Sequence, residues 1–431
     1  MYKTLRVLIG FAVLCMAHAA QAQYIGNTPY SRYGLGEINN NMGNTRNAGM
    51  AGAGISAANS YQANLSNPAL LYYNSITVFD MGIRGQVKTV QDSNNSQRDG
   101  NANLANLALV VPISKHWTSA VSLRPYSEVS YEVNSTKQTL EGNPRAYSIQ
   151  GYSGQGGLSE LSFSNGVKIA KGLTIGASAS YLFGTITKEA SSLIQDDSLS
   201  DLSSEQVVYS ERTRYNDFLF KAGVNYRKQL QDKLFLSMGG TYSFESNLNA
   251  DLNNAYERRT IYGGTLDEDI LADSSKSKVL LPQGWQAGIS LDNGSNMTLV
   301  ADFATQQWSK FRNLEGQQEL ADSYRAAIGG EYTPDAGSVA SYFKRITYRG
   351  GLYYGKTPYK VNNTQITDKG VTVGFSMPIG RSTIYDLYQL NTSLGYGQRG
   401  KTSNGLIAEK YFQFSAGITI NSRWFIKRRI E

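Results

Sequence analysis

The stretch LTIGASASYLF, residues Leu173–Phe183, alternates apolar and small polar side chains from end to end. Successive side chains of a β-strand point to opposite faces, so this pattern predicts a strand with one apolar and one polar face. The same pattern recurs in MTLVADFATQ (Met297–Gln306) and FQFSAGITIN (Phe412–Asn421). A β-sandwich gives the same alternation. Here the polar face carries mostly Gly, Ser, Thr, Asn and Gln, which favours a barrel with lipid outside and water inside.

The segments that alternate in this way are numerous and regularly connected. About fourteen follow Ile76, each close to the ~10 residues that a tilted membrane strand needs. Short turns alternate with long polar stretches at Glu132–Gly157, Lys188–Arg212 and Asn247–Lys278. The short turns are Ser114–Trp117, Ala170–Gly172, Asp292–Asn296 and Gly380–Thr383. We therefore predict an all-β fold, a transmembrane β-barrel of about 14 antiparallel strands with short periplasmic turns and long external loops.

The composition agrees with this class of protein. Among 431 residues there are 43 Gly and 29 Tyr, and only 17% of the residues are charged. The net charge of +7 is spread along the chain without a dense basic block, so the sequence does not indicate nucleic-acid binding. Tyr and Trp near the predicted strand ends, including Tyr242, Trp308 and Tyr332, are typical of the aromatic girdles at membrane interfaces.

The first 23 residues, MYKTLRVLIGFAVLCMAHAAQAQ, have the three parts of a secretory signal peptide. Lys3 and Arg6 give a positive start, residues 7–17 are apolar, and Ala20-Gln21-Ala22 is a cleavage site. We predict cleavage before Gln23, which makes residues 1–22 the signal peptide. Cys15, the only cysteine, would leave with it, so the mature chain would have no thiol for a disulfide, a metal site or nucleophilic catalysis.

Residues 23–75 do not alternate and are rich in Gly, Ala and Asn. They are too poor in apolar residues for a separate soluble core, so we predict that they form an N-terminal hatch or plug inside the lumen of a barrel spanning residues 76–431. A flexible periplasmic tail is the alternative.

Catalytic chemistry is not indicated. His116 is the only histidine after the predicted leader, and it falls in a short turn. A lone histidine at a periplasmic turn suits neither a Ser-His hydrolase nor a metal site. We predict neither an enzyme nor a cofactor.

Four motifs stand out along the chain: Asn67-Pro68-Ala69 before the first strand, ADFATQQWSKF (Ala301–Phe311), DSYRAAIGGEYTP (Asp322–Pro334) and YRGGLYYGKTPY (Tyr348–Tyr359). In this order they resemble the FadL/TodX-type outer-membrane transporters of hydrophobic compounds, also called OmpP1/FadL-like. SRYGLG (Ser31–Gly36) and WFIKRR (Trp424–Arg429) resemble the branch of this family that includes PorV-like barrel proteins of type IX secretion. The stretches predicted as external loops depart from the classical transporters, because they are rich in Ser, Asn and Asp rather than in apolar helices.

The resemblance implies a cell outer-membrane barrel for passive uptake of hydrophobic or amphipathic small molecules. The N-terminal hatch would gate it, and cargo would exit sideways into the lipid. Candidate hatch or gate residues are Arg32, Tyr33, Asn67, Pro68 and Ala69. Candidate lumen-facing charges, which either pack the hatch in place or let a ligand shift it, are Asp80, Arg84, Asp302, Arg325 and Arg349. The alternatives are a PorV-like accessory barrel that binds secretion-system proteins and a structural barrel whose loops are attachment sites.

Overall fold

A computed structural model describes residues 27–39, 43–138, 146–196, 205–260, 263–270, 275–314, 316, 320–379 and 387–422. The predicted signal peptide, the predicted turn at 380–383 and the C-terminal stretch from residue 423 lie outside the described residues. Within those ranges, no helix combines the length and the apolar character needed to cross a bilayer.

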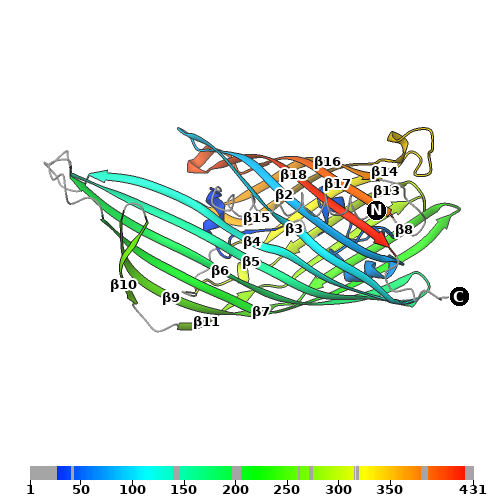
Figure 1. Ribbon diagram of the computed structural model, residues 1–431, viewed down its shortest axis with the longest axis horizontal. Coiled ribbons are helices and arrows are strands. Elements are labelled where there is room, and N and C mark those ends of the chain that lie inside the picture. The colour runs from blue at the N-terminus through cyan, green and yellow to red at the C-terminus, as the bar shows by residue number, and fades with distance from the viewer. Residues whose placement is uncertain are drawn as a thin grey trace, which may run out of the picture.

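The described chain is dominated by one antiparallel sheet of 18 strands, and fourteen of these close into a barrel, as predicted (Figure 1). β18 pairs with β2 along their whole length, which closes the cylinder. The barrel strands are β2 (Thr77–Gln91), β3 (Ser96–Ser114), β4 (Trp117–Gln138), β5 (Ala146–Ala170), β6 (Leu173–Asp196), β7 (Glu205–Gln231), β8 (Leu234–Ser243), β12 (Gly284–Asp292), β13 (Met297–Gln306), β14 (Ser323–Tyr332), β15 (Thr347–Val361), β16 (Thr364–Pro378), β17 (Leu387–Arg399) and β18 (Ala408–Ser422).

The outer face of the barrel is an apolar belt. Neighbouring strands place Leu161, Tyr181 and Phe218 in one row, and all three side chains are exposed. On the opposite side of the cylinder Leu352 and Phe412 are 60% and 66% exposed. The alternate positions face inward and are polar, such as Ser162 and Ser180, whose hydroxyls are hydrogen-bonded. An apolar exterior around a polar interior is stable only where the exterior meets lipid.

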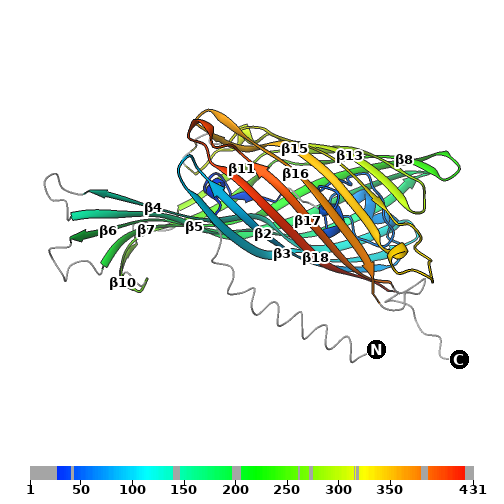
Figure 2. The same ribbon diagram turned by 90° about the horizontal axis from the view of Figure 1, so that it is seen from above.

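Four neighbouring strands extend far beyond this belt, which the sequence did not predict. β4, β5, β6 and β7 have 22, 25, 24 and 27 residues, whereas β13 and β14 have 10 each. The stretches predicted as long loops are therefore largely sheet, and Figure 2 shows them projecting past the other strands. We call this projection the sheet extension. β9 (Ser246–Thr260), β10 (Thr265–Ile270) and β11 (Ser275–Leu281) complete it.

The N-terminal segment, residues 27–39 and 43–74, runs inside the barrel (Figure 1). It contains the short helices η2 (Pro29–Arg32), α2 (Thr45–Ala48) and η3 (Pro68–Tyr73) and the two-residue strand β1 (Glu37–Ile38). Most of its side chains between residues 44 and 71 are buried. The remaining short helices lie in connections: η4 (Trp308–Lys310), η5 (Phe343–Arg345) and η6 (Ser403–Gly405).

The outer half of the lumen is filled by an apolar cluster, which we call the outer lumen cluster. Trp308 and Phe311, from the connection between β13 and β14, are each 2% exposed in it. The interpretation of Trp308 as a girdle residue is therefore wrong, because its connection folds into the barrel mouth. Tyr30 and Leu35 bring the N-terminal segment to the same cluster.

The position of the apolar belt can be tested with one pair of substitutions. Leu394 on β17 and Ile194 in the sheet extension are similarly exposed, at 57% and 60%. We expect Leu394→Arg to lower the free energy of unfolding by roughly 2–4 kcal/mol, the cost of an arginine near the middle of a bilayer. Ile194→Arg should cost far less, because that side chain meets water. Guanidinium unfolding of the barrel in liposomes measures both, and equal costs would contradict the assigned belt.

Candidate functional site

The N-terminal segment lies directly on the inner wall because glycines leave no side chains beneath it. A Cβ added to any of these glycines would come within 3.1 Å of an atom of the segment. They are Gly82, Gly417, Gly374, Gly351, Gly329, Gly288, Gly239, Gly223, Gly176 and Gly166, on β2, β18, β16, β15, β14, β12, β8, β7, β6 and β5. We call this set the glycine ring. It follows the segment around most of the barrel interior.

The Asn67-Pro68-Ala69 motif sits on three aligned glycines of the ring. Gly166, Gly176 and Gly223 are cross-strand partners on β5, β6 and β7. A Cβ on Gly176 would lie 2.4 Å from the Ala69 nitrogen, and one on Gly223 would lie 2.3 Å from the Asn67 Oδ1 atom. Only bare backbone leaves room for the motif here.

Asn67 and Pro68 also fit the start of a helix. The Asn67 Oδ1 atom accepts a hydrogen bond from the Ala69 N–H at 3.0 Å, which caps η3. Pro68 is the first residue of η3, where no N–H is needed. The Asn67 amide donates to the carbonyls of Ile55 and Val224, at 2.9 and 3.1 Å. Asn67 thus joins two parts of the segment to the wall, and Asn67, Pro68 and Ala69 are all buried.

All five charges predicted to face the lumen contact the N-terminal segment, either directly or through a shared partner. Asp302 accepts hydrogen bonds from the backbone N–H groups of Gly54 and Ile55 at 2.6 and 2.8 Å. It lies on β13 directly opposite Gly288 of the glycine ring, where β13 itself has no glycine. Asp80, 3% exposed, accepts from Asn106 and Thr419 of the wall and lies 3.4 Å from the Asn44 amide nitrogen. These carboxylates satisfy buried donors that would otherwise be unpaired.

Arg325 and Arg349 hold the other side of the segment. Arg325 donates to the Ala51 carbonyl at 2.9 Å. Arg349 lies 3.0 Å from Glu331, which also binds Arg46 of the segment at 2.6 Å. Sequence reasoning missed both Arg46 and Glu331. Arg46 is buried and Glu331 is largely so. Removing one partner of a buried ion pair typically lowers the free energy of unfolding by about 3–5 kcal/mol.

A different part of the N-terminal segment completes the barrel wall. Within the described residues, β3 and β4 pair only along Leu107–Ser114 and Trp117–Leu123. Beyond these points the two strands diverge, and we call the facing stretches, residues 96–106 and 124–138, the wall seam. Residues 27–39 of the segment lie along this edge of β4.

Hydrogen bonds from residues 27–39 close the wall seam. β1 pairs with β4, with Glu37 opposite Glu128 and Ile38 opposite Ser127. The Thr28 N–H donates to the Ser130 carbonyl at 2.7 Å. Asn27 spans the seam, because its backbone N–H donates to Asp99 of β3 and its amide donates to the Glu132 carbonyl of β4.

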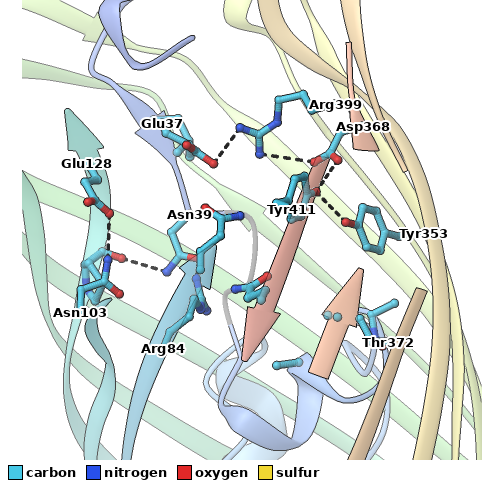
Figure 3. Close-up of a pocket in the computed structure, with 18 of the residues that line it drawn as sticks. Glu37, Asn39, Arg84, Asn103, Glu128, Tyr353, Asp368, Thr372, Arg399 and Tyr411 are labelled. Carbon is cyan, nitrogen blue, oxygen red and sulfur yellow. Dashed lines mark hydrogen bonds and ion pairs between the residues drawn. The ribbon is translucent and has the colours of Figure 1, made fainter. Parts of the chain in front are cut away.

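A polar cavity of about 130 Å³ lies directly behind this closure (Figure 3). Asn101, Asn103 and Glu128 line it from the seam, and Glu37 and Asn39 from the N-terminal segment. Glu128 accepts from Asn101 and Asn103 at 2.9 and 2.8 Å, so side chains bridge the seam where backbone pairing has ended.

Arg399 lines the far side of the cavity and forms most of its ion pairs. Its guanidinium lies 2.8 Å from Glu37, 3.3 Å from Glu409 and 3.6 Å from Asp368. Lys88 is the second cation at Glu37, 3.6 Å away. Burial by itself would raise the pKa of the Glu37 carboxyl, but Arg399 and Lys88 lower it to about 2, so Glu37 stays ionised at neutral pH. None of these five residues was among the site residues predicted from the sequence.

The remaining predicted residues lie near this cavity or beside the segment. Arg84 lines the cavity and donates to the Asn39 side chain at 2.7 Å. Arg32 is exposed and donates to the Tyr33 hydroxyl at 2.7 Å. Tyr33 packs at a tilt against Tyr359, with 6.5 Å between ring centroids. The prediction thus selected two separate regions, the base of the segment at residues 67–69 and its exposed turn at 32–33.

Comparison with solved structures finds the same fold at low sequence identity. The Pseudomonas putida toluene transporter TodX is 15% identical, with a TM-score of 0.59, and the match covers 90% of this chain and 100% of TodX. The CymD monoaromatic hydrocarbon channel is 16% identical, with a TM-score of 0.56 and coverage of 90% and 99%. A Pseudomonas aeruginosa FadL homologue is 13% identical, with a TM-score of 0.56 and coverage of 89% and 98%. No curated protein matches the sequence.

The chain is thus a membrane β-barrel with the fold of the FadL/TodX-type structures and a filled lumen. A family model described as BamG matches residues 1–431, and the chain belongs to that family.

The glycine ring makes a prediction about the Asn67-Pro68-Ala69 anchor. We expect Gly176→Ala to push this motif off the wall, because the new Cβ would meet the Ala69 nitrogen and the Pro68 carbonyl carbon at 2.4 Å. Overpacking of this kind costs about 1–3 kcal/mol. Limited proteolysis of the N-terminal segment and guanidinium unfolding in liposomes measure the two effects.

Gly350→Ala is the matched control, since the nearest atom to its Cβ would be 3.9 Å away. The control should behave as wild type. A Gly176→Ala barrel with wild-type stability and an undigested segment would contradict the role given to the ring.

Proposed function

We propose that the protein admits hydrophobic or amphipathic small molecules through the outer membrane and releases them sideways into the lipid through the wall seam. The N-terminal segment is the hatch. The observation that carries this proposal is the wall seam itself, a stretch of barrel wall closed by residues 27–39 instead of by strand pairing. We keep the prediction that residues 1–22 are a signal peptide removed during export.

Two adjoining cavities support a route through the barrel. The cavity behind the wall seam shares Glu37, Ile38 and Arg399 with a second cavity of about 80 Å³. Trp308 and Tyr359 of the outer lumen cluster line the second cavity. The two cavities therefore lie one after the other between the mouth of the barrel and the seam, and β1 separates them.

The hatch divides into a fixed and a movable part. Residues 44–71 rest on the glycine ring and are held by buried polar contacts, including the ion pair of Arg46 with Glu331. Residues 27–39 are held by the edge of β4, by the ion pairs of Glu37 and by the packing of Tyr30 and Leu35 in the outer lumen cluster. Asn67, Pro68 and Ala69 belong to the fixed part, whereas Arg32 and Tyr33 belong to the movable part. Only the movable part has to leave for the seam to open.

The polarity of the cavity favours cargo with a polar end. TodX is a toluene transporter and CymD is a monoaromatic hydrocarbon channel. In this chain Arg84, Arg325 and Arg399 line the cavity together with Glu37 and Asp368. Burying a wholly apolar molecule against these groups would strip them of water without replacing their hydrogen bonds.

A disulfide across the closed seam tests the route. Ile38 and Ser127 are directly opposite in an antiparallel pair, where Cα atoms are about 4.5–5.5 Å apart, a separation that a disulfide can span. We expect oxidised Ile38→Cys/Ser127→Cys cells to take up labelled laurate no faster than cells that lack the protein. Reduction should restore uptake.

Ser164→Cys/Ser178→Cys is the matched control, because these residues pair across β5 and β6, away from the seam. Oxidation of the control should leave laurate uptake unchanged. Full uptake by the oxidised Ile38→Cys/Ser127→Cys barrel would refute lateral exit at this seam.

A second candidate function is that of an accessory barrel that binds a protein of a secretion machinery, and the sheet extension favours it. Val133, Tyr152 and Tyr256 are 44%, 51% and 48% exposed. Val133 is paired directly with Tyr152, and the pairing continues across β6 and β7 to Tyr256. The three side chains therefore lie on one face of the sheet. A contiguous exposed apolar face of this kind is typical of interaction surfaces.

This second candidate predicts loss of a partner without loss of the barrel. We expect a secretion-machinery protein to copurify with the wild-type chain and to be absent from the Val133→Ser/Tyr152→Ser/Tyr256→Ser variant. Laurate uptake should be unchanged in that variant. If the same proteins copurify with both chains, the extension is not the docking surface.

A further inference from the structure

The outer face of the barrel carries a row of basic side chains at the end that bears the sheet extension. The row follows the strand pairing from β16 to β3, through Lys369, Gln398, Lys410, Thr89 and Arg98. Directly paired residues share one face of a sheet, and the three basic side chains are exposed. We call Lys369, Lys410 and Arg98 the cationic row. Figure 2 shows β16, β17, β18, β2 and β3 side by side on one flank of the barrel.

The cationic row lies at the upper border of the apolar belt. Tyr396 of β17 and Phe412 of β18 end the belt there, with 4.9 Å between their ring centroids, and both are exposed. Two residues further toward the sheet extension, on the same face, these strands carry Gln398 and Lys410. The row therefore stands at the depth where acyl chains end and lipid head groups begin.

The protein itself does not neutralise this row. The acidic neighbours of its members in the sequence face the other side of the wall, because successive side chains of a strand point to opposite faces. Asp368 and Glu409 pair with Arg399 inside the barrel, and Asp99 accepts from the backbone N–H of Asn27. Within the part of the chain that the structure describes, no carboxylate pairs with any member of the cationic row. Three positive charges are thus presented to the lipid interface.

The basic side chains gather on one arc of the barrel. Lys356 of β15 extends the arc, since it is paired with Thr367 and lies diagonally across from Lys369. Such diagonal neighbours are about 7–8 Å apart. On β5, β6 and β7 the first outward-facing residues above the belt are neutral: Ser159, Thr185 and Asn216. The arc from β15 to β3 therefore differs in charge from the flank formed by β5, β6 and β7.

The spacing of the cationic row suits a phosphorylated head group. Lys369 and Lys410 are two strands apart, as are Lys410 and Arg98, which separates each pair of Cα atoms by about 10 Å. Lysine has a long, flexible stem, so neighbouring ammonium groups can converge on one phosphate or bind two phosphates of one molecule. Gln398 and Thr89, between the cations, add neutral hydrogen-bond donors. The belt directly below offers an apolar surface for acyl chains.

We propose that the cationic row binds the phosphate groups of a phosphorylated lipid in the outer leaflet, whose acyl chains lie along the apolar belt. This lipid is bound outside the barrel, so the inference goes beyond the proposed function and does not depend on the hatch or on any cargo. A basic residue beside anionic lipid strengthens binding by about fivefold. Several such residues on one arc therefore select phosphorylated lipids from their neutral neighbours and fix the depth of this arc in the membrane.

Native mass spectrometry of the purified barrel in detergent tests the proposal. The probe is lipid A, a glycolipid with two phosphate groups, and the titration gives the number of bound lipids and the Kd. We expect Lys369→Gln/Lys410→Gln to bind lipid A about 25-fold more weakly than wild type, because two cations are lost. Fully dephosphorylated lipid A should bind both proteins equally weakly. Inorganic phosphate at the same concentration should not displace lipid A from wild type.

Arg212→Gln/Arg214→Gln is the matched control. It also removes two exposed cations at this end of the barrel, but from β7. The control should bind lipid A as wild type does, and heat-modified gel mobility verifies that each barrel is folded.

Three results would overturn the inference. Equal weakening in the control would mean that net charge, and not the cationic row, attracts the lipid. Equally tight binding of dephosphorylated lipid A by wild type would mean that the acyl chains alone are recognised. Displacement of lipid A by inorganic phosphate at lipid A concentrations would mean that the row takes a free anion instead of a lipid.

Discussion

The structure depends on close contact between the backbone of residues 44–71 and the inner wall of the barrel. Each peptide buried there must find hydrogen-bond partners, and each wall side chain beneath it would push it away. The glycine ring removes the obstruction. Where β13 has Asp302 in place of a ring glycine, its carboxylate accepts hydrogen bonds from two backbone amides of the segment. The lumen is therefore filled by a chain segment that has hardly any apolar core of its own.

This contact divides the N-terminal segment into parts of unequal stability. The part on the glycine ring also carries the buried Arg46, whose ion pair with Glu331 joins it to β14. Residues 27–39 have the edge of β4, the Glu37 ion pairs and the packing of Tyr30 and Leu35 in the outer lumen cluster instead. Local opening follows the weakest set of contacts. In the proposed function, movement of the segment is confined to the stretch that closes the wall seam, so the lumen can stay filled while the wall opens.

The sequence predicted what depends on local periodicity and missed what depends on closure of the barrel. Alternation in Leu173–Phe183 indicated a lipid-facing and a lumen-facing side, and Gly176 lies on the side predicted to face inward. The partners of Glu331 and Arg399 come from distant strands and from the N-terminal segment, so no local pattern marks them. The sheet extension was mistaken for loops because its strands are rich in polar residues, with only a few apolar positions, such as Val133 and Tyr152, on one face. Trp308 was misplaced because its connection turns into the lumen.

The order of environments along the proposed route explains why charge belongs in the middle of it. The outer lumen cluster is apolar, the cavity behind β1 is lined by arginines and carboxylates, and the lipid beyond the seam is apolar again. A molecule with an apolar tail and a charged head gains contacts at each stage, provided that head and tail are handled separately. Arg399 and Lys88 are the cations that the proposed route would present to a head group, and both now bind Glu37. Glu37 therefore stands on the proposed route and at the seam at once, because it also forms half of β1.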